Sequence, residues 1–547
     1  MIVASGRRVS GSAFNACYAL QTITIPGSVT EIGNYAFANC RVLTNVNLSS
    51  GLMTIGDQAF AFCSGLRVIA IPDSVTGIGR RAFQDCNNLT AVGHPNSLTS
   101  IGEAAFINCS SLENIAIPGT LSVISKEAFS GCSSLSGVTI SEGVTEIGAD
   151  AFRNCSSLEE ILIPASVTTF PTDYFGDLDN SVFSGCSNLT AITVAEDNTS
   201  YCSVGGVLYD HSVSTLLACP EGFQGAYTVP NGVERIGNNA FANCSRLTDL
   251  SLPDSVANIG LHAFSGCSGI TAMTLPDGLT ALDSYAFSGC TGLTGMVVPE
   301  SVTEVGTKVF ENCTGLVHID FLANDNYIND NLFLNCTSLE SVTISSAAYS
   351  IYPDAFSGCT ALKEIRVDGD NGWYNSIHGV LYSGKGINLE ICPTAMEGKL
   401  ILPPGLAQIQ KEAMRNCSRV TEISIPASLT TVGRDAFSGC SGLSDIYYEG
   451  TEEQWAAISI ETGNELLGNA TVHFQALSYN LLTLPANLTT IESEAFVGLQ
   501  NVGVIYVPAS VISIADDAFD EGIVIAAPEG SYAVSWAKAN DFAYLDE

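Results

Sequence analysis

The sequence predicts a mainly β solenoid, because one short pattern recurs at a fixed spacing along most of its 547 residues. A phenylalanine, usually preceded by alanine, returns every 23 residues over long runs. A unit this short cannot bury a core alone and must stack on its neighbours. We count eighteen such positions, at Phe14, Phe37, Phe60, Phe83, Phe106, Phe129, Phe152, Phe183, Phe241, Phe264, Phe287, Phe310, Phe333, Phe356, Met414, Phe437, Phe496 and Phe519.

Within one unit, residues 36–56, apolar and polar side chains alternate. Val46 and Leu48 alternate with Asn45 and Asn47, which predicts one parallel strand with a single buried side. In most units a proline then ends the strand, and a segment of the pattern h-T-x-I-G, in which h is an apolar residue, gives a second extended piece. We therefore expect two parallel sheets and little helix, limited to single turns near the Ala-Phe pairs.

The nineteen cysteines follow the same rhythm. One thiol per unit at a constant register indicates a buried stack of small, reduced side chains. Adjacent turns lie about 5 Å apart, so disulfides stay open as an alternative. The last two units carry Leu499 and Gly522 at this position, which favours packing over metal binding. The sixteen stacked cysteines are Cys17, Cys40, Cys63, Cys86, Cys109, Cys132, Cys155, Cys186, Cys244, Cys267, Cys290, Cys313, Cys336, Cys359, Cys417 and Cys440.

Two insertions interrupt the rhythm and are copies of each other. Residues 201–210 (YCSVGGVLYD) match residues 374–383 (YNSIHGVLYS), and each copy is expected to form a β-hairpin. A shorter acidic loop is expected at residues 173–180. A third long interruption should contain a short helix from Glu452 to Ile458. Ser531 is expected to cap a C-terminal helix.

These interruptions divide the single solenoid into segments. The predicted segments are a first repeat block (1–197), a hairpin insertion (198–228), a second repeat block (229–367), a second hairpin insertion (368–400), further repeats (401–446), an insertion containing Gln-Trp (447–478) and the last repeats with a C-terminal cap (479–547).

The charge balance limits the classes of partner. The chain has 20 Lys+Arg against 56 Asp+Glu, a net charge of −36, which disfavours binding to nucleic acid or anionic lipid. The sequence has no run of 18 apolar residues, so we expect no membrane insertion. Residues 1–12 lack the apolar region of a signal peptide, and Val9 already occupies a position inside a unit. We expect a leader and an N-terminal cap to lie upstream; an abnormal start of the open reading frame is the alternative.

The repeat resembles that of the BspA-like leucine-rich-repeat proteins (the LRR_5 type). The pattern A-F-x-x-C-x-x-L-x-x-I-x-I-P-x-S-V-T-x-I-G carries the resemblance over essentially the whole chain. The Gly-Val-Leu-Tyr hairpins, the Y-x-G-T-x-x-Q-W segment at Tyr448–Trp455 and the G-S-Y-A sequence from Gly530 are also similar to that family. The resemblance implies a secreted or surface-displayed adhesin of a host-associated microbe, with no catalytic motif. No leader, sorting signal or appended binding module is visible in this sequence, so display rests on the resemblance.

The sequence contains no recognisable catalytic, metal or cofactor site. The six histidines are scattered over different units, and none pairs with Cys or Asp at a metal-ligand spacing. Residues 368–373 (DGDNGW) hold oxygen ligands but lack the closing glutamate of a calcium loop. We therefore predict a protein that is not an enzyme and that uses no cofactor.

The residue between the two buried positions of each strand is mostly Thr, Ser, Asn or Ala. Such a ribbon suits broad contact with a host or cell-surface protein or glycan, although these residues also simply fit exposed strands. A structural spacer that displays another domain, and a scaffold for a catalytic domain, are the alternatives. For Trp455, a purely structural role is the alternative to a contact role. The candidate contact residues are Trp373, Tyr374, Tyr447, Tyr448, Trp455 and Tyr506.

Overall fold

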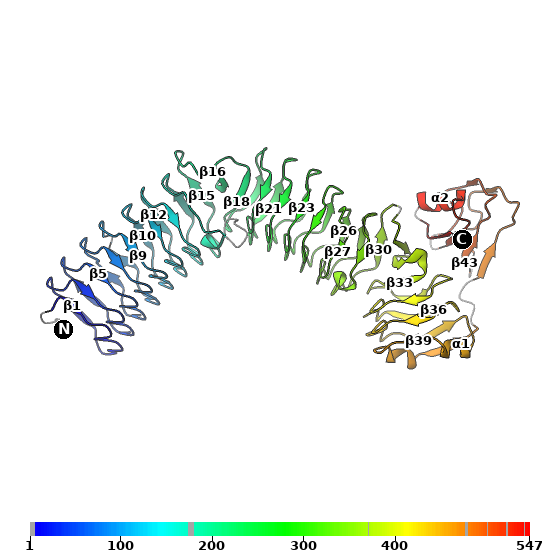
Figure 1. The fold of residues 1–547 in the computed structure, drawn as a ribbon, viewed down its shortest axis with the longest axis horizontal. Helices are drawn as coiled ribbons and strands as arrows, with labels where there is room; N and C mark the ends of the chain where they lie inside the picture. Colours follow the sequence, from blue (N-terminus) through cyan, green and yellow to red (C-terminus); the bar gives the residue numbers. More distant parts are fainter. Residues whose placement is uncertain are drawn as a thin grey trace. The chain divides into compact units, whose positions relative to one another are not determined.

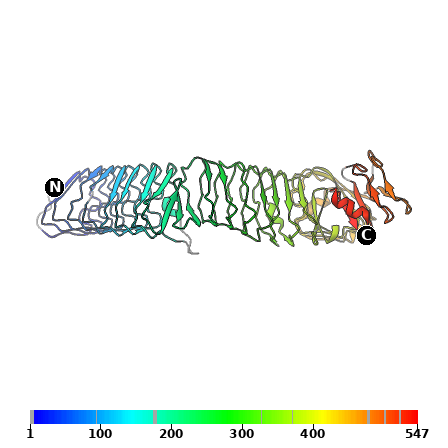
Figure 2. The same ribbon diagram turned by 90° about the horizontal axis from the view of Figure 1, so that it is seen from above.

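The structure is a computed structural model that describes residues 6–93, 95–172, 180–325, 327–369, 371–475, 480–499, 502–520, 523–540 and 542–546. It divides the chain into two compact units, Met1–Cys290 and Thr291–Glu547. Each unit is a stack of β coils, and Figures 1 and 2 show the strands of successive turns lying side by side within each stack. The fold is the predicted parallel β-solenoid with little helix. Its turns number about 22, more than the eighteen marked positions, because the insertions add strands of their own.

Most turns contribute a longer strand and a shorter strand, and the strands of each kind pair in parallel from turn to turn. The longer strand β2 (Thr22–Ile25) pairs in parallel with β4 (Asn45–Leu48), and Ile23 lies opposite Val46. The shorter strand β3 (Glu31–Ile32) pairs in parallel with β1 (Arg8–Val9) and belongs to the second sheet. The predicted second sheet is therefore present. Within a strand, side chains alternate between the core and solvent, as the period of two requires.

In the first unit, the longer-strand series continues through β6 (Val68–Ile69), β8 (Ala91–Val92), β10 (Asn114–Ile117), β12 (Gly137–Ile140), β14 (Glu160–Ile163), β15 (Ala191–Val194), β19 (Gly225–Thr228) and β21 (Leu247–Ser251). The shorter series continues through β5 (Thr54–Ile55), β7 (Gly77–Ile78), β9 (Ser100–Ile101), β11 (Val123–Ile124), β13 (Glu146–Ile147), β20 (Arg235–Ile236), β22 (Asn258–Ile259) and β23 (Ala281–Leu282).

In the second unit, the longer series comprises β24 (Gly295–Val298), β26 (His318–Phe321), β28 (Ser341–Ile344), β30 (Glu364–Val367), β34 (Gly398–Ile401), β36 (Val420–Ile425), β38 (Asp445–Tyr448), β40 (Thr471–Phe474), β41 (Asn480–Thr483), β43 (Val502–Tyr506), β45 (Val524–Ala527) and β46 (Tyr544–Asp546). The shorter series comprises β25 (Glu304–Val305), β27 (Tyr327–Ile328), β29 (Ser350–Ile351), β35 (Gln408–Ile409), β37 (Thr431–Val432), β39 (Ser459–Ile460), β42 (Thr490–Ile491) and β44 (Ser513–Ile514).

The recurring phenylalanines form a stack through the core. The rings of Phe37 and Phe60 lie 5.2 Å apart between centroids and are nearly parallel, and Phe60 stacks in the same way on Phe83 at 5.4 Å. These rings are fully buried. A turn with a residue in the left-handed region, such as Tyr35 (φ 58°), precedes each Ala-Phe pair in this part of the chain. The predicted helical turns at these pairs are 3₁₀ segments in η1 (Asn180–Phe183) and η2 (Pro353–Phe356).

Both predicted hairpins are present and join the shorter-strand sheet in the same way. In the first insertion β16 (Tyr201–Val204) and β17 (Val207–Asp210) are antiparallel, and β18 (Thr215–Ala218) links them to the parallel series. The second insertion repeats this order with β31 (Tyr374–Ile377), β32 (Val380–Ser383) and β33 (Asn388–Ile391).

The remaining helices are short and occur where the sequence places them. Helix α1 (Glu452–Ala456) begins with a capping box of Thr451 and Gln454 and ends two residues before the predicted Ile458. Helix α2 (Tyr532–Ala539) is capped by Ser531, whose Oγ accepts a hydrogen bond from Val534 N at 3.3 Å. Two further 3₁₀ segments are η3 (Gly384–Gly386) and η4 (Glu465–Gly468). The predicted acidic loop lies outside the described residues, except that Asn180 begins η1.

Across the described residues, no helix combines the length and the apolar character that crossing a membrane requires.

Candidate interaction site at the second insertion

The six predicted contact residues separate into two groups. Trp373 is 60% exposed, and Tyr374 next to it is half-buried. Tyr447 is also half-buried, because His473 stacks on its ring at 4.8 Å and Lys399 Nζ lies 4.8 Å from the ring centroid. Tyr506 is half-buried against the core of the second unit. The structure therefore brings Trp373 and Tyr374 together in one group at the second insertion. The other group, which lies apart from it, comprises Tyr447, Tyr448, Trp455 and Tyr506.

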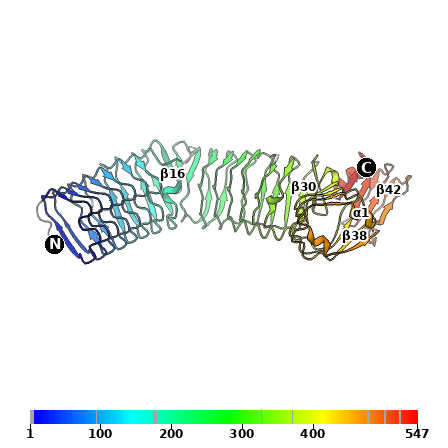
Figure 3. The same ribbon diagram turned by 60° about the horizontal axis from the view of Figure 1, so that its bottom comes forward.

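Tyr448 corrects the prediction of a contact surface on β38. Neighbouring residues of a strand point to opposite sides of the sheet, so that Tyr448 is only 1% exposed although Tyr447 reaches the surface. Its ring packs edge-on against that of Trp455 in α1 at 5.2 Å, and Figure 3 shows α1 close to β38. Trp455 is half-buried against the same core, which agrees with a structural role for this residue.

Trp373 belongs to a line of exposed aromatic rings, which we call the aromatic stripe and define as Tyr327, Tyr349 and Trp373. Tyr349 lies edge-on to Trp373 at 5.4 Å and edge-on to Tyr327 at 6.0 Å. The exposed fractions of Tyr327 and Tyr349 are 44% and 48%. Three large rings on successive turns make an apolar contact surface in a protein whose exposed strands otherwise carry mainly small side chains.

The sequence reasoning missed Tyr327 and Tyr349. Both lie at the shorter strands, one at the start of β27 and one immediately before β29, at positions where the other units carry no aromatic residue. The prediction followed the longer strands and the insertions instead. The signal was available as two aromatic residues 22 positions apart at slots that hold no aromatic residue elsewhere.

Asn371 holds the backbone at Trp373 in place. Its Oδ1 accepts hydrogen bonds from the backbone N–H groups of Trp373 and Tyr374, at 2.8 and 2.9 Å. Its Nδ2 donates to Ala348 O at 2.7 Å, which ties this segment to the turn that carries Tyr349. Such a backbone clamp removes the conformational freedom that an exposed tryptophan would lose on binding.

The first insertion contains the same clamp without the tryptophan. Asn198 Oδ1 accepts from the N–H groups of Ser200 and Tyr201, and Asn198 Nδ2 donates to Val167 O at 2.8 Å. Ser200 therefore occupies the position of Trp373. Because the same local structure forms with serine, the hairpin does not require an aromatic residue there.

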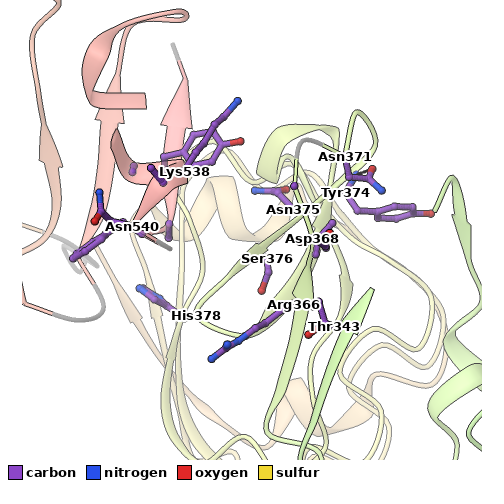
Figure 4. Close-up of a pocket in the computed structure, with 18 of the residues that line it drawn as sticks. Thr343, Arg366, Asp368, Asn371, Tyr374, Asn375, Ser376, His378, Lys538 and Asn540 are labelled. Atoms are coloured by element: carbon purple, nitrogen blue, oxygen red, sulfur yellow. Dashed lines mark hydrogen bonds between the residues drawn. The ribbon is translucent and has the colours of Figure 1, made fainter. Parts of the chain in front are cut away.

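A cavity of about 980 Å³ lies beside the second hairpin within the second unit. One wall comes from β28, β30 and β31, and the other from α2 and the start of β46. Figure 4 shows Arg366, His378 and Asn375 on one side and Lys538 and Asn540 on the C-terminal segment opposite. The close approach of this segment to the insertion is also visible in the packing of Leu545 near η3.

The cavity is lined by groups of both charges. Arg366 Nε donates to Glu364 Oε1 at 2.8 Å, and Asp368 lies in the same wall. Burial raises the pKa of the Tyr374 phenol, and this hydroxyl accepts a hydrogen bond from Ile351 N at 3.3 Å. Across the described part of the chain, no group of three or more His, Cys, Asp and Glu residues could hold a metal ion.

Comparison with known proteins identifies the repeat. Residues 7–92, 54–180, 234–363, 396–461 and 469–527 match the sequence model of the BspA type leucine rich repeat region, with six copies. No curated protein matches the chain.

Several solved structures are similar to this chain. A leucine-rich cell surface protein of Faecalibacterium prausnitzii A2-165 is 26% identical, with 84% of this chain and 88% of that chain covered and a TM-score of 0.36. The pneumococcal vaccine antigen PcpA is 18% identical, with coverages of 83% and 79% and a TM-score of 0.40. A leucine-rich-repeat protein of Eubacterium ventriosum ATCC 27560 is 22% identical, with coverages of 75% and 83% and a TM-score of 0.39.

Proposed function

The chain belongs to the BspA-type leucine-rich-repeat family, and from this premise we propose that it is a non-enzymatic interaction scaffold of the adhesin kind. In this proposal it is secreted or displayed on a cell surface, and it binds a protein or glycan of a host or of another cell. Repeats of this type typically serve binding rather than catalysis, because stacking uses their regular positions.

The aromatic stripe is the observation that supports binding. Tyr327, Tyr349 and Trp373 present three rings on successive turns, and such rings contribute a large share of the energy at protein and glycan interfaces. The first insertion has Ser200 at the position of Trp373, and the two turns before it carry Thr168 and Glu146 at the positions of Tyr349 and Tyr327. A chain that acted only as a spacer would have no use for this difference between two copies of one element.

Binding of the whole protein to immobilised matrix proteins, glycans and cells tests the proposal. We expect saturable binding that Trp373→Ser weakens by about tenfold or more, because a buried interface tryptophan often contributes 2 kcal/mol or more. Serine is the residue of the first insertion, so the hairpin should fold unchanged. Tyr18→Ala is the matched control, because Tyr18 is an equally exposed aromatic residue of the first unit.

The spacer alternative predicts a different result. If the folded protein binds none of these surfaces, or if Trp373→Ser and Tyr18→Ala bind as the unaltered protein does, the stripe is not a contact site. The array would then serve to display another domain.

A further inference from the structure

We infer that the cavity between the second insertion and the C-terminal segment is a binding site for a neutral oligosaccharide. The inference rests on the proposed function and names the ligand class of one site within it. It is carried by the contents of the cavity and by their comparison with the first insertion.

The comparison separates residues that the hairpin needs from residues that it does not need. Asn371, Tyr374, Ser376 and Gly379 have the counterparts Asn198, Tyr201, Ser203 and Gly206, so these side chains belong to the shared hairpin. The cavity residues of opposite charge do not recur. Glu364, Arg366, Asp368 and His378 stand where the first copy has Ala191, Thr193, Ala195 and Gly205.

His378 shows this most clearly. It is the first residue of the two-residue turn between β31 and β32 and adopts φ 51°, in the left-handed region. A turn of this type favours glycine, and Gly205 fills the position in the first copy with φ 59°. The second copy therefore holds an imidazole at the cavity in a backbone conformation that glycine adopts with less strain.

One polar atom in the cavity wall lacks a partner. Asn375 Oδ1 is buried and has no hydrogen-bond partner among the described residues, although it lies on the strand that lines the cavity. This oxygen has almost no accessible surface, so a ligand in the cavity does not reach it in this conformation, and leaving it unsatisfied costs about 1–3 kcal/mol. Cys202 occupies this position in the first insertion, so the amide is another difference between the copies.

These groups match the chemistry of a neutral sugar. A sugar hydroxyl both donates and accepts, and the cavity lining contains carboxylate acceptors beside guanidinium and ammonium donors. Tyr374, Phe542 and Tyr544 also line the cavity, and aromatic rings are side chains on which the apolar side of a pyranose packs; Lys538 Nζ lies over one of these rings, 5.2 Å from the centroid of Tyr544. The volume of about 980 Å³ lies at the upper end of the range for small-ligand sites.

The charges argue for a neutral rather than an acidic ligand. Glu364 and Asp368 lie in the cavity wall, and the chain as a whole carries a net charge of −36. Arg366 and Lys538 in the same lining balance these two carboxylates, so a carboxylated sugar would gain no net local attraction, and the negative field of the whole chain would repel it, most strongly at low salt.

The test is a glycan-binding measurement on the full chain, with neutral oligosaccharides, their uronic-acid counterparts and acetate as probes. We expect one or more neutral glycans to bind, and Arg366→Thr and Asp368→Ala each to weaken that binding by about tenfold, as expected for hydrogen bonds to charged groups. Both changes install the residues of the first copy. Arg67→Thr and Asp197→Ala are controls that remove the same charges from exposed positions of the first unit.

The outcomes separate this inference from the proposed function. Tighter binding of acidic than of neutral glycans would contradict the ligand class. The absence of glycan binding, with cell binding that still depends on Trp373, would overturn the cavity site and leave the aromatic stripe. The loss of cell binding in Trp373→Ser with retained glycan binding in the cavity would show two independent sites.

Discussion

At the scale of single residues, the cysteine of each unit connects two turns. Cys86 Sγ donates to Phe60 O at 3.1 Å, in the turn before its own, and Cys109 Sγ donates to Phe83 O at the same distance. All nineteen cysteines are free thiols in the structure, as the stacked reduced arrangement requires. The thiol thus fills space as a small apolar group and also satisfies a carbonyl that alanine would leave without this donor.

The first prediction concerns that hydrogen bond. Cys86→Ala should lower the stability of the folded chain by about 1–2 kcal/mol, because it removes a donor and leaves a small cavity. The urea concentration at the midpoint of unfolding measures the effect. Asn87→Ala changes an exposed neighbour and should leave the midpoint unchanged. Equal midpoints for both variants would show that the thiol contributes nothing.

The second prediction follows from the protonation of the thiols. Burial raises the pKa of Cys86 to about 12 and that of Cys40 to about 11, from an ordinary value of 9.0. Because the pKa is higher in the folded state than the ordinary 9.0, the protonated thiols contribute fully to the free energy of unfolding below pH 9.0. This contribution falls as the pH rises from 9.0 towards the raised values, since the unfolded chain loses protons first. Urea midpoints measured between neutral pH and pH 10 should therefore decrease above pH 9. A constant midpoint across that interval would contradict protonated, buried thiols.

At the scale of elements, the phenylalanine stack determines how one turn packs on the next. Phe83 contacts Phe60 at 5.4 Å and Phe106 at 5.0 Å between ring centroids. One unit replaces the phenylalanine by Met414, which is buried in the same position. A flexible side chain of similar volume therefore fits between two turns.

The third prediction uses this natural replacement. Phe83→Ala should destabilise the first unit by about 3–5 kcal/mol through the cavity that it creates, whereas Phe83→Met should cost less than about 1.5 kcal/mol. Hydrogen exchange of the neighbouring strands should rise in the alanine variant, because each turn packs mainly on its neighbours. If both variants exchange alike, ring volume is not what holds the turns together.

The elements also show how far the sequence could be interpreted. The 23-residue period predicts the two sheets, and local alternation and turn residues predict the hairpins and the cap at Ser531. The choice of Tyr448 as a contact residue was wrong, because Tyr448 pairs with Ile425 in the buried position of the strand, whereas the tyrosine before it points to the opposite side. The period also gives no sign of the cavity, because residues about 170 positions apart, such as Arg366 and Lys538, form it by folding.

At the scale of the whole molecule, the regular turns and the irregular insertions have different roles. The regular positions stack phenylalanines, thiols and strands, and they recur because each turn must fit the next. The second insertion departs from its own copy at positions that the hairpin does not need. We therefore propose that specific binding occurs at the second insertion.

An exchange between the copies tests this claim most directly. A variant with Arg366→Thr, Asp368→Ala, Trp373→Ser and His378→Gly places four residues of the first copy at the corresponding positions of the second. The measurement is binding of this variant and of the unaltered protein to the same cells, alongside their thermal unfolding. The account predicts an unchanged or slightly higher unfolding temperature, because glycine relaxes the turn at residue 378, together with the loss of binding. Full binding by the folded variant would contradict it.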